Sequence, residues 1–527
     1  MKNPIDDILF VGGGTAGWLT AAILAKRTMA HPAGGMRITV VESSDIPTVG
    51  VGEGTFPTIA RTLAALGVDE AEFMRESGAA FKQGIRFVDW ARPPEDGRHS
   101  HYYHPFALPR RKDLDLLPYW LSGEAGEGVS FADAVTLQEK VCDAGRAPKR
   151  VTDAEFRGPM NYAYHLDAAR FGAYLRKVAI SMGVTHRIAT VERVDLAEDG
   201  SIAAVSTREH GRITADLYID CTGFRSELLG RAMGVPFNDK NDVLFVDRAV
   251  AVQVPHRMGE SSIPPYTIST AHEAGWTWDI ALAHRRGVGY VYSSRHTSAV
   301  RAEAVLRDYA GRAADEIEVR HLKLQVGWRA QHWVKNCVAV GLSGGFLEPL
   351  ESTGIILIEA AAFHLSHLLQ PGCDLQCVAK QFNGCMTRRY ERIVDFIKMH
   401  YYLTQRRDTD FWRENALAET APQSLLAHLQ TWRERAPSPF DFAMEDESFA
   451  PANYQFVLYG MGFRTAARRA ARPDPCAAFA RQEFARVREA SKRAVAALPA
   501  HRELLERVYQ AGFSFSDAGR SPKASRQ

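Results

Sequence analysis

Three glycines near the start of the chain have the spacing of a phosphate-binding turn. In "ILFVGGGTAGW", Gly12, Gly14 and Gly17 follow an apolar stretch and precede a helical pattern over residues 18–27. Such a G-x-G-x-x-G turn lets the backbone approach a pyrophosphate, which then lies at the positive end of the helix. The motif alone also fits a glycine turn without a ligand, so its surroundings must decide between the two interpretations.

A second apolar stretch with a final carboxylate favours the ligand. "MRITVVE" ends at Glu42, which can accept a hydrogen bond from a ribose hydroxyl. Two further strand-and-glycine segments follow much later, at residues 215–223 and 335–345. This order is typical of FAD-dependent hydroxylase-like flavoproteins, so we expect FAD. On this layout the predicted cofactor contacts are Gly12, Gly14, Thr15, Ala16, Gly17, Glu42, Val49, Val51, Val191, Leu342 and Ile355.

Composition limits the partners. The 527 residues exceed the length of about 250–300 at which one core stops growing, so we expect more than one unit. A net charge of +2 gives no reason to expect nucleic acid or acidic lipid. The seven cysteines are dispersed without a CxxC pair, which predicts reduced thiols and no metal site. Without a secretory leader or a long apolar run, the prediction is a cytoplasmic protein that does not enter a membrane.

The order of the patterns predicts a mixed α/β fold with a nucleotide-binding module, a β-sheet substrate region and a mostly helical C-terminal part. "FKQGIRFVDW" alternates like a single strand, "AYHLDAARFGAYLRKVAISMG" has the period of a helix, and residues 275–294 predict a β-hairpin. The predicted domains are a discontinuous FAD-binding module (1–90, 150–240 and 330–370), an insertion that contributes to the substrate site (91–149), a substrate-side sheet (241–329), a helical substrate-covering domain (371–510) and a disordered tail (511–527).

Several short motifs, in this order along the chain, resemble those of the flavin-dependent tryptophan halogenases. They are "VGVGEGT", "FKQGIRF", "YYHPF", "GWTWDI", "GGFLEPLESTGI" and "FIKMHYYLTQRRDTDFWR". The resemblance implies that reduced FAD, supplied by a separate flavin reductase, and oxygen convert a halide (chloride or bromide) into hypohalous acid at the flavin. The acid then halogenates an electron-rich aromatic carbon. For the assembly, either a monomer or a homodimer is expected.

The resemblance also assigns roles to particular residues. Lys82 and Glu351 are the expected catalytic pair: the lysine holds the oxidant, and the carboxylate stabilises or deprotonates the cationic ring intermediate. Glu348 is not the expected acid, because the family's carboxylate directly precedes Ser-Thr-Gly. The remaining assignments are a halide site at Thr353 and Gly354, substrate contacts at His104, Phe106, Glu351, Ser352 and Asn453, and a flavin shield of Trp276 and Trp278.

Each of these residues also has a plainer interpretation. A lysine on a strand is usually solvated, a carboxylate before a helix can simply pair with its dipole, and two tryptophans on one strand face can belong to a core. Read without the family, His104 is a loop histidine. The family's Ile-Pro step is also absent, because Ile280 is followed by Ala281. Only the joint appearance of the motifs favours the catalytic assignments.

One region departs from the family pattern. Halogenases of free tryptophan carry a tyrosine pair, a glutamate and a Phe-Trp step that hold the amino-acid group, whereas "RAPSPFDFAMEDESFAPANYQFVLYGMG" keeps Asn453 and Tyr454 but lacks the Tyr pair and the Phe-Trp step. We therefore predict that indole or an indole derivative is the substrate, with C3 favoured where it is unblocked. The alternatives are an FAD-dependent aromatic hydroxylase, a free-tryptophan halogenase and a flavin carrier without activity.

Overall fold

A computed structural model describes residues 5–28, 36–46, 50, 52–109, 114–256, 262–369, 374–442, 447–466 and 474–514. Val49, Val51 and residues 515–527 of the predicted tail lie outside the described residues. Ala511, the first residue of that predicted tail, instead ends a helix that is followed by Gly512.

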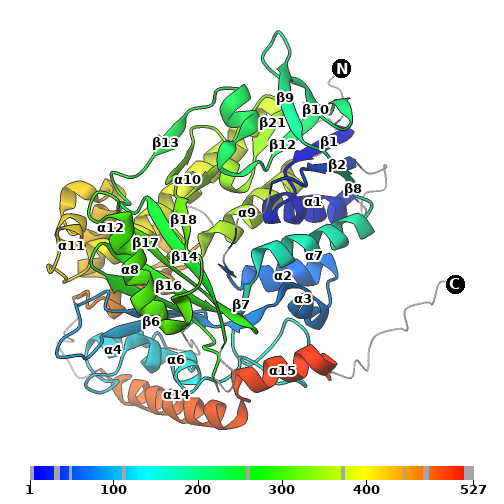
Figure 1. Cartoon of the computed structure of the whole chain (residues 1–527). Helices are drawn as coiled ribbons and strands as arrows, with labels where there is room; N and C mark the ends of the chain where they lie inside the picture. The colour runs from blue at the N-terminus through cyan, green and yellow to red at the C-terminus, as the bar shows by residue number, and fades with distance from the viewer. Residues whose placement is uncertain are drawn as a thin grey trace.

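A six-stranded sheet forms the nucleotide-binding side of the molecule (Figure 1). Its first strand pairs in parallel with the next strand along the chain and with a strand much later in the sequence, as in a doubly wound fold. The strand order is β20 (Trp333–Val334), β21 (Cys337–Ala339), β12 (Leu217–Asp220), β1 (Asp7–Val11), β2 (Arg37–Glu42) and β8 (Thr185–Ile188).

Three helices pack together beside this sheet (Figure 1). α1 (Thr15–Thr28) directly follows β1 through the glycine turn, and it contacts both α7 (Ala168–Ser181) and α9 (Thr353–Leu368). The side chains of Leu19, Ala22 and Ile38 are buried in the main core of the protein. α9, which begins at the Ser-Thr-Gly motif, thereby packs against the helix that follows the glycine turn.

A seven-stranded sheet forms the predicted substrate region. The hairpin expected at 275–294 is present as β16 and β17, and β15 pairs in parallel with β5 while the other neighbours are antiparallel. The order is β18 (Arg320–Lys323), β14 (Arg248–Pro255), β17 (Arg285–Tyr292), β16 (Gly275–Ala281), β15 (Thr267–His272), β5 (Gly84–Val88) and β6 (His101–Pro105).

The single strand predicted for residues 81–90 was wrong. The segment forms two strands in different sheets: β4 (Ala80–Lys82) pairs with β7 (Ala163–Leu166), which also pairs with β3 (Glu53–Gly54), whereas β5 joins the seven-stranded sheet. The break falls at Gly84, which has a φ of 153° and no room for a Cβ beside the carbonyl oxygen of His104. Lys82 is therefore separated from the strand that carries Arg86.

The helix predicted from Ala163 begins later than expected. Residues 163–166 form the central strand of the small sheet, and α7 begins at Ala168. Asp167 accepts hydrogen bonds from the backbone N–H groups of Ala169 and Arg170, so it caps the helix. Pairing with β3 and β4 overrides the helical period of the preceding residues.

Helices dominate the C-terminal third, as expected. α10 (Leu375–Tyr402) is the longest of the described helices, and α14 and α15 lie along one side of the molecule (Figure 1). The other described α-helices are α2 (Thr58–Leu66), α3 (Glu70–Ser77), α4 (Leu117–Leu121), α5 (Phe131–Val135), α6 (Gln138–Asp143), α8 (Ala299–Ala310), α11 (Asp410–Asn415), α12 (Gln423–Glu434), α13 (Pro451–Gly460), α14 (Ala477–Ala497) and α15 (His501–Ala511).

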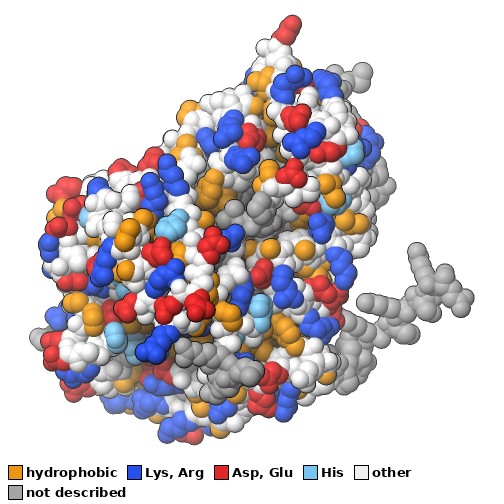
Figure 2. Space-filling view, in the orientation of Figure 1, with side chains coloured by type: hydrophobic (Ala, Val, Ile, Leu, Met, Phe, Trp, Pro, Cys, Tyr) orange, Lys and Arg blue, Asp and Glu red, His pale blue; other side chains and the backbone are white. Residues whose placement is uncertain are grey.

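Further short elements complete the α/β architecture of the described residues. One three-stranded sheet has the order β11 (Gly211–Ile213), β10 (Ile202–Thr207) and β9 (Val191–Leu196). A second has the order β13 (Phe237–Asp239), β19 (Gly327–Arg329) and β22 (Gly345–Phe346), and a short 3-10 helix, η4 (Gly341–Ser343), precedes β22. The predicted fold class, a mixed α/β flavoprotein fold, is confirmed. On the face shown in Figure 2, basic and acidic side chains are interspersed rather than gathered by sign.

Candidate active site

The glycine turn has the geometry of a cofactor cradle. A side chain at Gly12 or Gly17 would collide with neighbouring backbone oxygens, so these two glycines allow strand, turn and helix to pack closely. Gly14 is different, because a Cβ built there has no atom within 4 Å. The turn therefore presents bare backbone to open space at the N-terminus of α1, where unpaired N–H groups favour a phosphate.

Glu42 lies against this turn. A Cβ at Gly13 would collide with the Glu42 carboxylate. The carboxylate contacts Arg176 at 3.1 Å and His186 at 2.8 Å, both through Oε1, while the one hydrogen bond that Oε2 accepts from the described residues is a long one of 3.4 Å from Trp18. Oε2 therefore keeps acceptor capacity for a ribose hydroxyl. The turn and the carboxylate together fit FAD.

The remaining cofactor candidates divide into two groups. Gly341, next to Leu342, packs so closely on Ala16 that a Cβ there would lie 2.7 Å from it, and Ile355 is buried in the first turn of α9. Val191 begins β9, close to the end of β2, because Ala189 donates to the carbonyl of Glu42. The structure thus places Leu342 near the turn and Val191 beside the Glu42 end of the sheet.

Lys82 is completely buried rather than solvated. Its ammonium donates a 2.9 Å hydrogen bond to Ser352 and lies 5.2 Å from the ring centre of Phe106 and 5.9 Å from that of Phe56. Burial lowers the pKa of Lys82 to about 7, although the charge of Glu351 opposes this shift. Gly54 makes room for it, since a Cβ there would lie 3.0 Å from the ammonium.

Ser352 connects Lys82 to the start of α9. It adopts a left-handed backbone with a φ of 55°, an uncommon conformation for a residue other than glycine. Such strain clusters at functional sites, and here it accompanies the hydrogen bond from Lys82. The N–H groups of Thr353 and Gly354 follow at the helix start, and a Cβ at Gly354 would have no atom within 4 Å. This open helix N-terminus fits a halide.

Glu351 is completely buried and lies between two histidines. His104 Nδ1 contacts both carboxylate oxygens, at 3.0 and 2.9 Å, and His400 Nε2 contacts Oε1 at 3.0 Å. Burial alone would raise the pKa of Glu351, but the two histidines outweigh it and lower the pKa to about 2. The two histidines therefore favour the carboxylate form of Glu351.

Asn453 reaches this cluster through His104. Its Nδ2 lies 2.8 Å from His104 Nε2, while its Oδ1 accepts a hydrogen bond from the backbone of Ala450. The residue predicted to touch substrate thus contacts a second predicted substrate residue. His400 completes the set of residues around Glu351. It was not singled out from the sequence, although it lies in "FIKMHYYLTQRRDTDFWR", a segment that also resembles the family.

Aromatic rings surround the catalytic candidates. We define the aromatic cluster as Phe56, Phe106, Phe396, Phe449 and Phe456, which lie around His104. His104 is 5.7 Å from Phe396 and 6.4 Å from both Phe449 and Phe456, and Phe56 is 5.7 Å from Phe106 and 5.5 Å from Phe449. Phe449 was also missed from the sequence, although it precedes Asn453 by four residues.

The two tryptophans of β16 share one buried face, with ring centres 6.4 Å apart. Trp276 donates a 3.2 Å hydrogen bond to Glu348, which also accepts one from Tyr401 at 2.7 Å. Burial raises the pKa of Glu348 to about 8 despite these donors, so the acid is mainly neutral at pH 7. Glu348 and Glu351 are thus held in opposite protonation states three residues apart.

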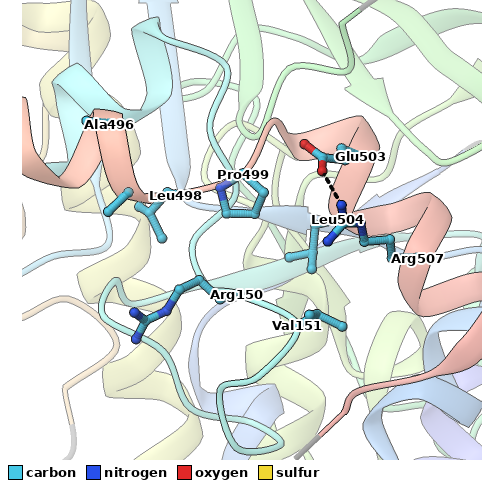
Figure 3. Close-up of a pocket in the computed structure, with 9 residues that line it drawn as sticks. Arg150, Val151, Ala496, Leu498, Pro499, Glu503, Leu504 and Arg507 are labelled. Atoms are coloured by element: carbon cyan, nitrogen blue, oxygen red, sulfur yellow. Dashed lines mark ion pairs between the residues drawn. The ribbon is translucent and has the colours of Figure 1, made fainter.

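A surface pocket of about 300 Å³ lies elsewhere (Figure 3). It is formed by Arg150, Val151 and the junction of α14 and α15, where Glu503 pairs with Arg507 at 2.7 Å. It contains none of the predicted site residues. Within the described ranges, no group of three His, Cys, Asp or Glu side chains could hold a metal ion. None of the helices in the described part is long and apolar enough to cross a membrane.

Comparison with known proteins identifies the class. The family model described as tryptophan halogenase matches residues 7–474. The chain therefore belongs to the flavin-dependent tryptophan halogenases. It is a flavoprotein oxidoreductase that uses reduced FAD and a halide, and such enzymes act on an aromatic substrate with a separate flavin reductase.

Individual relatives match over nearly the whole chain. The tryptophan halogenase from Shewanella frigidimarina is 40% identical, with a TM-score of 0.93 over 97% of this chain and 99% of that one. Tryptophan 6-halogenase SttH from Streptomyces toxytricini is 36% identical over 95% of this chain and 98% of its own. Tryptophan 7-halogenase RebH from Lentzea aerocolonigenes is 35% identical over 88% and 90%.

The open space at Gly14 yields a direct test of the cofactor site. We expect Gly14→Val to lower FAD affinity by at least about 100-fold, which corresponds to about 2.7 kcal/mol of binding free energy. The valine side chain would fill the space through which the backbone approaches the pyrophosphate. Fluorescence titration with FAD measures the change. Gly384→Val, in α10 and away from the turn, is the matched control and should bind FAD normally. Normal FAD binding by Gly14→Val would show that the turn is only structural.

Proposed function

We propose that this enzyme halogenates an indole-type ring, using Lys82 to hold the hypohalous acid and Glu351 to act on the ring. The observation that carries the proposal is that a fully buried lysine and a fully buried carboxylate lie at the same turn, next to the aromatic cluster. Lys82 donates a hydrogen bond to Ser352, and Glu351 directly precedes Ser352 in the chain. Burying two ionisable groups costs stability unless they are compensated, so a purely structural role would leave this arrangement without a reason.

Reduced FAD and oxygen supply the oxidising power that turns the halide into hypohalous acid. The open N-terminus of α9 at Thr353 and Gly354 fits the halide before that step. Trp276 and Trp278, buried on one face of β16, are suited to separating the organic substrate from the flavin. These assignments leave only the small oxidant to pass between the cofactor and the aromatic cluster.

Lys82 can hold the oxidant in either protonation state. With a pKa of about 7, both the ammonium and the amine are populated near neutrality. The ammonium donates a hydrogen bond to the oxygen of hypohalous acid and makes the halogen more electrophilic. The neutral amine can instead form an N–halogen bond while the O–halogen bond breaks and water leaves.

Glu351 acts at the end of the reaction. When the halogen bonds to a ring carbon, a cationic ring forms, and a fixed carboxylate stabilises it. Loss of the ring proton to the carboxylate returns the C–H electron pair to the ring and restores aromaticity. A carboxylate with a pKa of about 2 suffices, because a cationic ring of this kind is a much stronger acid than an ordinary carboxylic acid.

The aromatic cluster supports a flat substrate. Its five phenylalanines offer stacking and edge contacts to an electron-rich ring but no partner for a zwitterion. An unpaired ammonium or carboxylate of free tryptophan would carry a desolvation penalty there. We therefore propose indole or a simple indole derivative, with attack at C3, the most nucleophilic carbon. SttH and RebH are named as tryptophan halogenases of positions 6 and 7, so this choice of substrate distinguishes the present enzyme from them.

Substitution of Lys82 tests both its role in the reaction and the stability that its burial costs the fold. We expect Lys82→Met to abolish halogenation while flavin oxidation and peroxide release continue. The variant should gain a few kcal/mol of stability at pH 7, since the lowered pKa means that the folded protein disfavours the ammonium. That gain should shrink as the pH rises from about 7 to about 10, because the unfolded lysine also loses its proton there.

Product analysis by mass spectrometry and thermal unfolding at several pH values measure both effects. Glu351→Gln should also lose halogenation while FAD binding is retained. Appreciable halogenation by Lys82→Met would refute the assignment of Lys82.

Competition between two substrates tests the proposed ring. At equal concentrations of indole and free tryptophan, with bromide, FAD and a flavin reductase, we expect 3-bromoindole to dominate the products. Bromide should serve at least as well as chloride, because it is more readily oxidised. Efficient chlorination of tryptophan at a single position would instead mean that the residues around Asn453 do bind the amino-acid group. Hydroxylated indole without halogen would favour the aromatic hydroxylase.

A further inference from the structure

The hydrogen bonds of His400 define where its protons lie. His400 is buried on α10, and its Nδ1 lies 2.9 Å from the backbone carbonyl oxygen of Phe396. A carbonyl oxygen can only accept a hydrogen bond, so Nδ1 must carry a proton. Neutral imidazole has a single N–H, which this contact uses, and Nε2 would then be an acceptor.

The second nitrogen faces an acceptor as well. His400 Nε2 lies 3.0 Å from Glu351 Oε1. Two acceptors at this distance in a buried site would repel each other, so one proton must lie between them. The pair is therefore either an imidazolium with a carboxylate or a neutral imidazole with a carboxylic acid.

His104, on the other side of Glu351, has a different arrangement. The Oδ1 atom of Asn453 accepts the N–H of Ala450 at 2.7 Å, which turns its Nδ2 towards His104 Nε2 at 2.8 Å. His104 Nε2 is then an acceptor, and Nδ1–H donates to both oxygens of Glu351. Asn453 thus holds His104 as a neutral donor.

We propose that His400 is a positioning residue that is an imidazolium in the resting enzyme and keeps Glu351 a carboxylate. The donor bond from His104 to both carboxylate oxygens favours the ionised acid over the neutral one, which selects the imidazolium form of the pair. The two histidines therefore differ in charge although both contact Glu351. The catalytic role of His400 rests on the proposed function, whereas its protonation state does not.

The other groups that face Glu351 agree with this charge. Lys82 of β4 acts on it through space, and Tyr102 of β6 has a pKa raised well above its ordinary value by burial and by Glu351, so its hydroxyl stays neutral. His400 itself is enclosed by the rings of Phe87, Trp90 and Phe396. Glu351 is thus the anion that faces the imidazolium.

A permanently ionised Glu351 has a chemical consequence. The carboxylate is present before the halogen reaches the ring, so no proton has to leave the site before the cationic ring forms. The fixed dipoles around it need little reorganisation at that moment. His400 acts through Glu351 and needs no contact with substrate.

Nuclear magnetic resonance of the full-length protein tests the protonation without any turnover. With ¹⁵N-labelled histidine at pH 7, we expect His400 to show two protonated ring nitrogens and His104 to show only a protonated Nδ1. His400→Gln and His104→Gln assign the two signals. Glu351→Gln should remove the Nε2 proton of His400 and leave it neutral. A neutral His400 in the wild-type enzyme would overturn the proposal.

The pH profile of halogenation tests the role. In His400→Gln the cation beside Glu351 is lost, so the pKa of Glu351 should rise and activity should fall on the acid side. We expect the acid limb of the rate profile to move to higher pH by about one to three units in the variant, because the protonated acid cannot accept the ring proton. His321→Gln, on the partly exposed β18, is the control and should follow the wild-type profile.

The outcomes separate the two claims. A loss of rate that is uniform across pH would assign His400 to packing and overturn its positioning role. Absence of halogenation of any aromatic compound by the wild-type enzyme would refute the proposed function, but the histidine signals would still report the shared proton.

Discussion

The burial of the Lys82 amino group is the constraint on which the site depends. An ammonium taken out of water must be compensated, and here it has one hydrogen bond, two aromatic rings and the field of Glu351. This incomplete compensation lowers the pKa of Lys82 to about 7. A closer ion pair would stabilise the ammonium further and remove the amine form. The separation of Lys82 from Glu351 by Ser352 is therefore what keeps both the ammonium and the amine form accessible near neutral pH.

The fold satisfies this constraint by bringing distant segments together. The small sheet of β3, β7 and β4 fixes Lys82, Gly54 leaves it space, and the left-handed Ser352 turns the start of α9 towards it. The same turn follows Glu351, so the contact with Lys82 and the position of the carboxylate depend on one backbone feature. α10 and β6 then supply the histidines that decide the charge of the carboxylate.

Sequence patterns predicted the local parts of this design. The strand, glycine turn and helix at residues 7–28 and the hairpin of β16 and β17 follow from short-range signals, and the family motifs pointed to Lys82 and Glu351. The break between β4 and β5 was missed because it depends on the approach of β6 to Gly84. His400 and Phe449 were missed for a similar reason. His400 lies within the family segment "FIKMHYYLTQRRDTDFWR", but the roles of both residues arise from contacts across the fold that the segment does not reveal.

The central claim is that Lys82 and Glu351 pass the oxidant to the ring inside the protein. The most direct measurement is the partition of halogen between indole and an excess of an electron-rich trap too large to enter the site. The account predicts that the wild-type enzyme halogenates indole with little loss to the trap, whereas Lys82→Met releases peroxide and halogenates neither compound. Equal loss of halogen to the trap in both proteins would show that the oxidant acts in solution, and it would contradict the account.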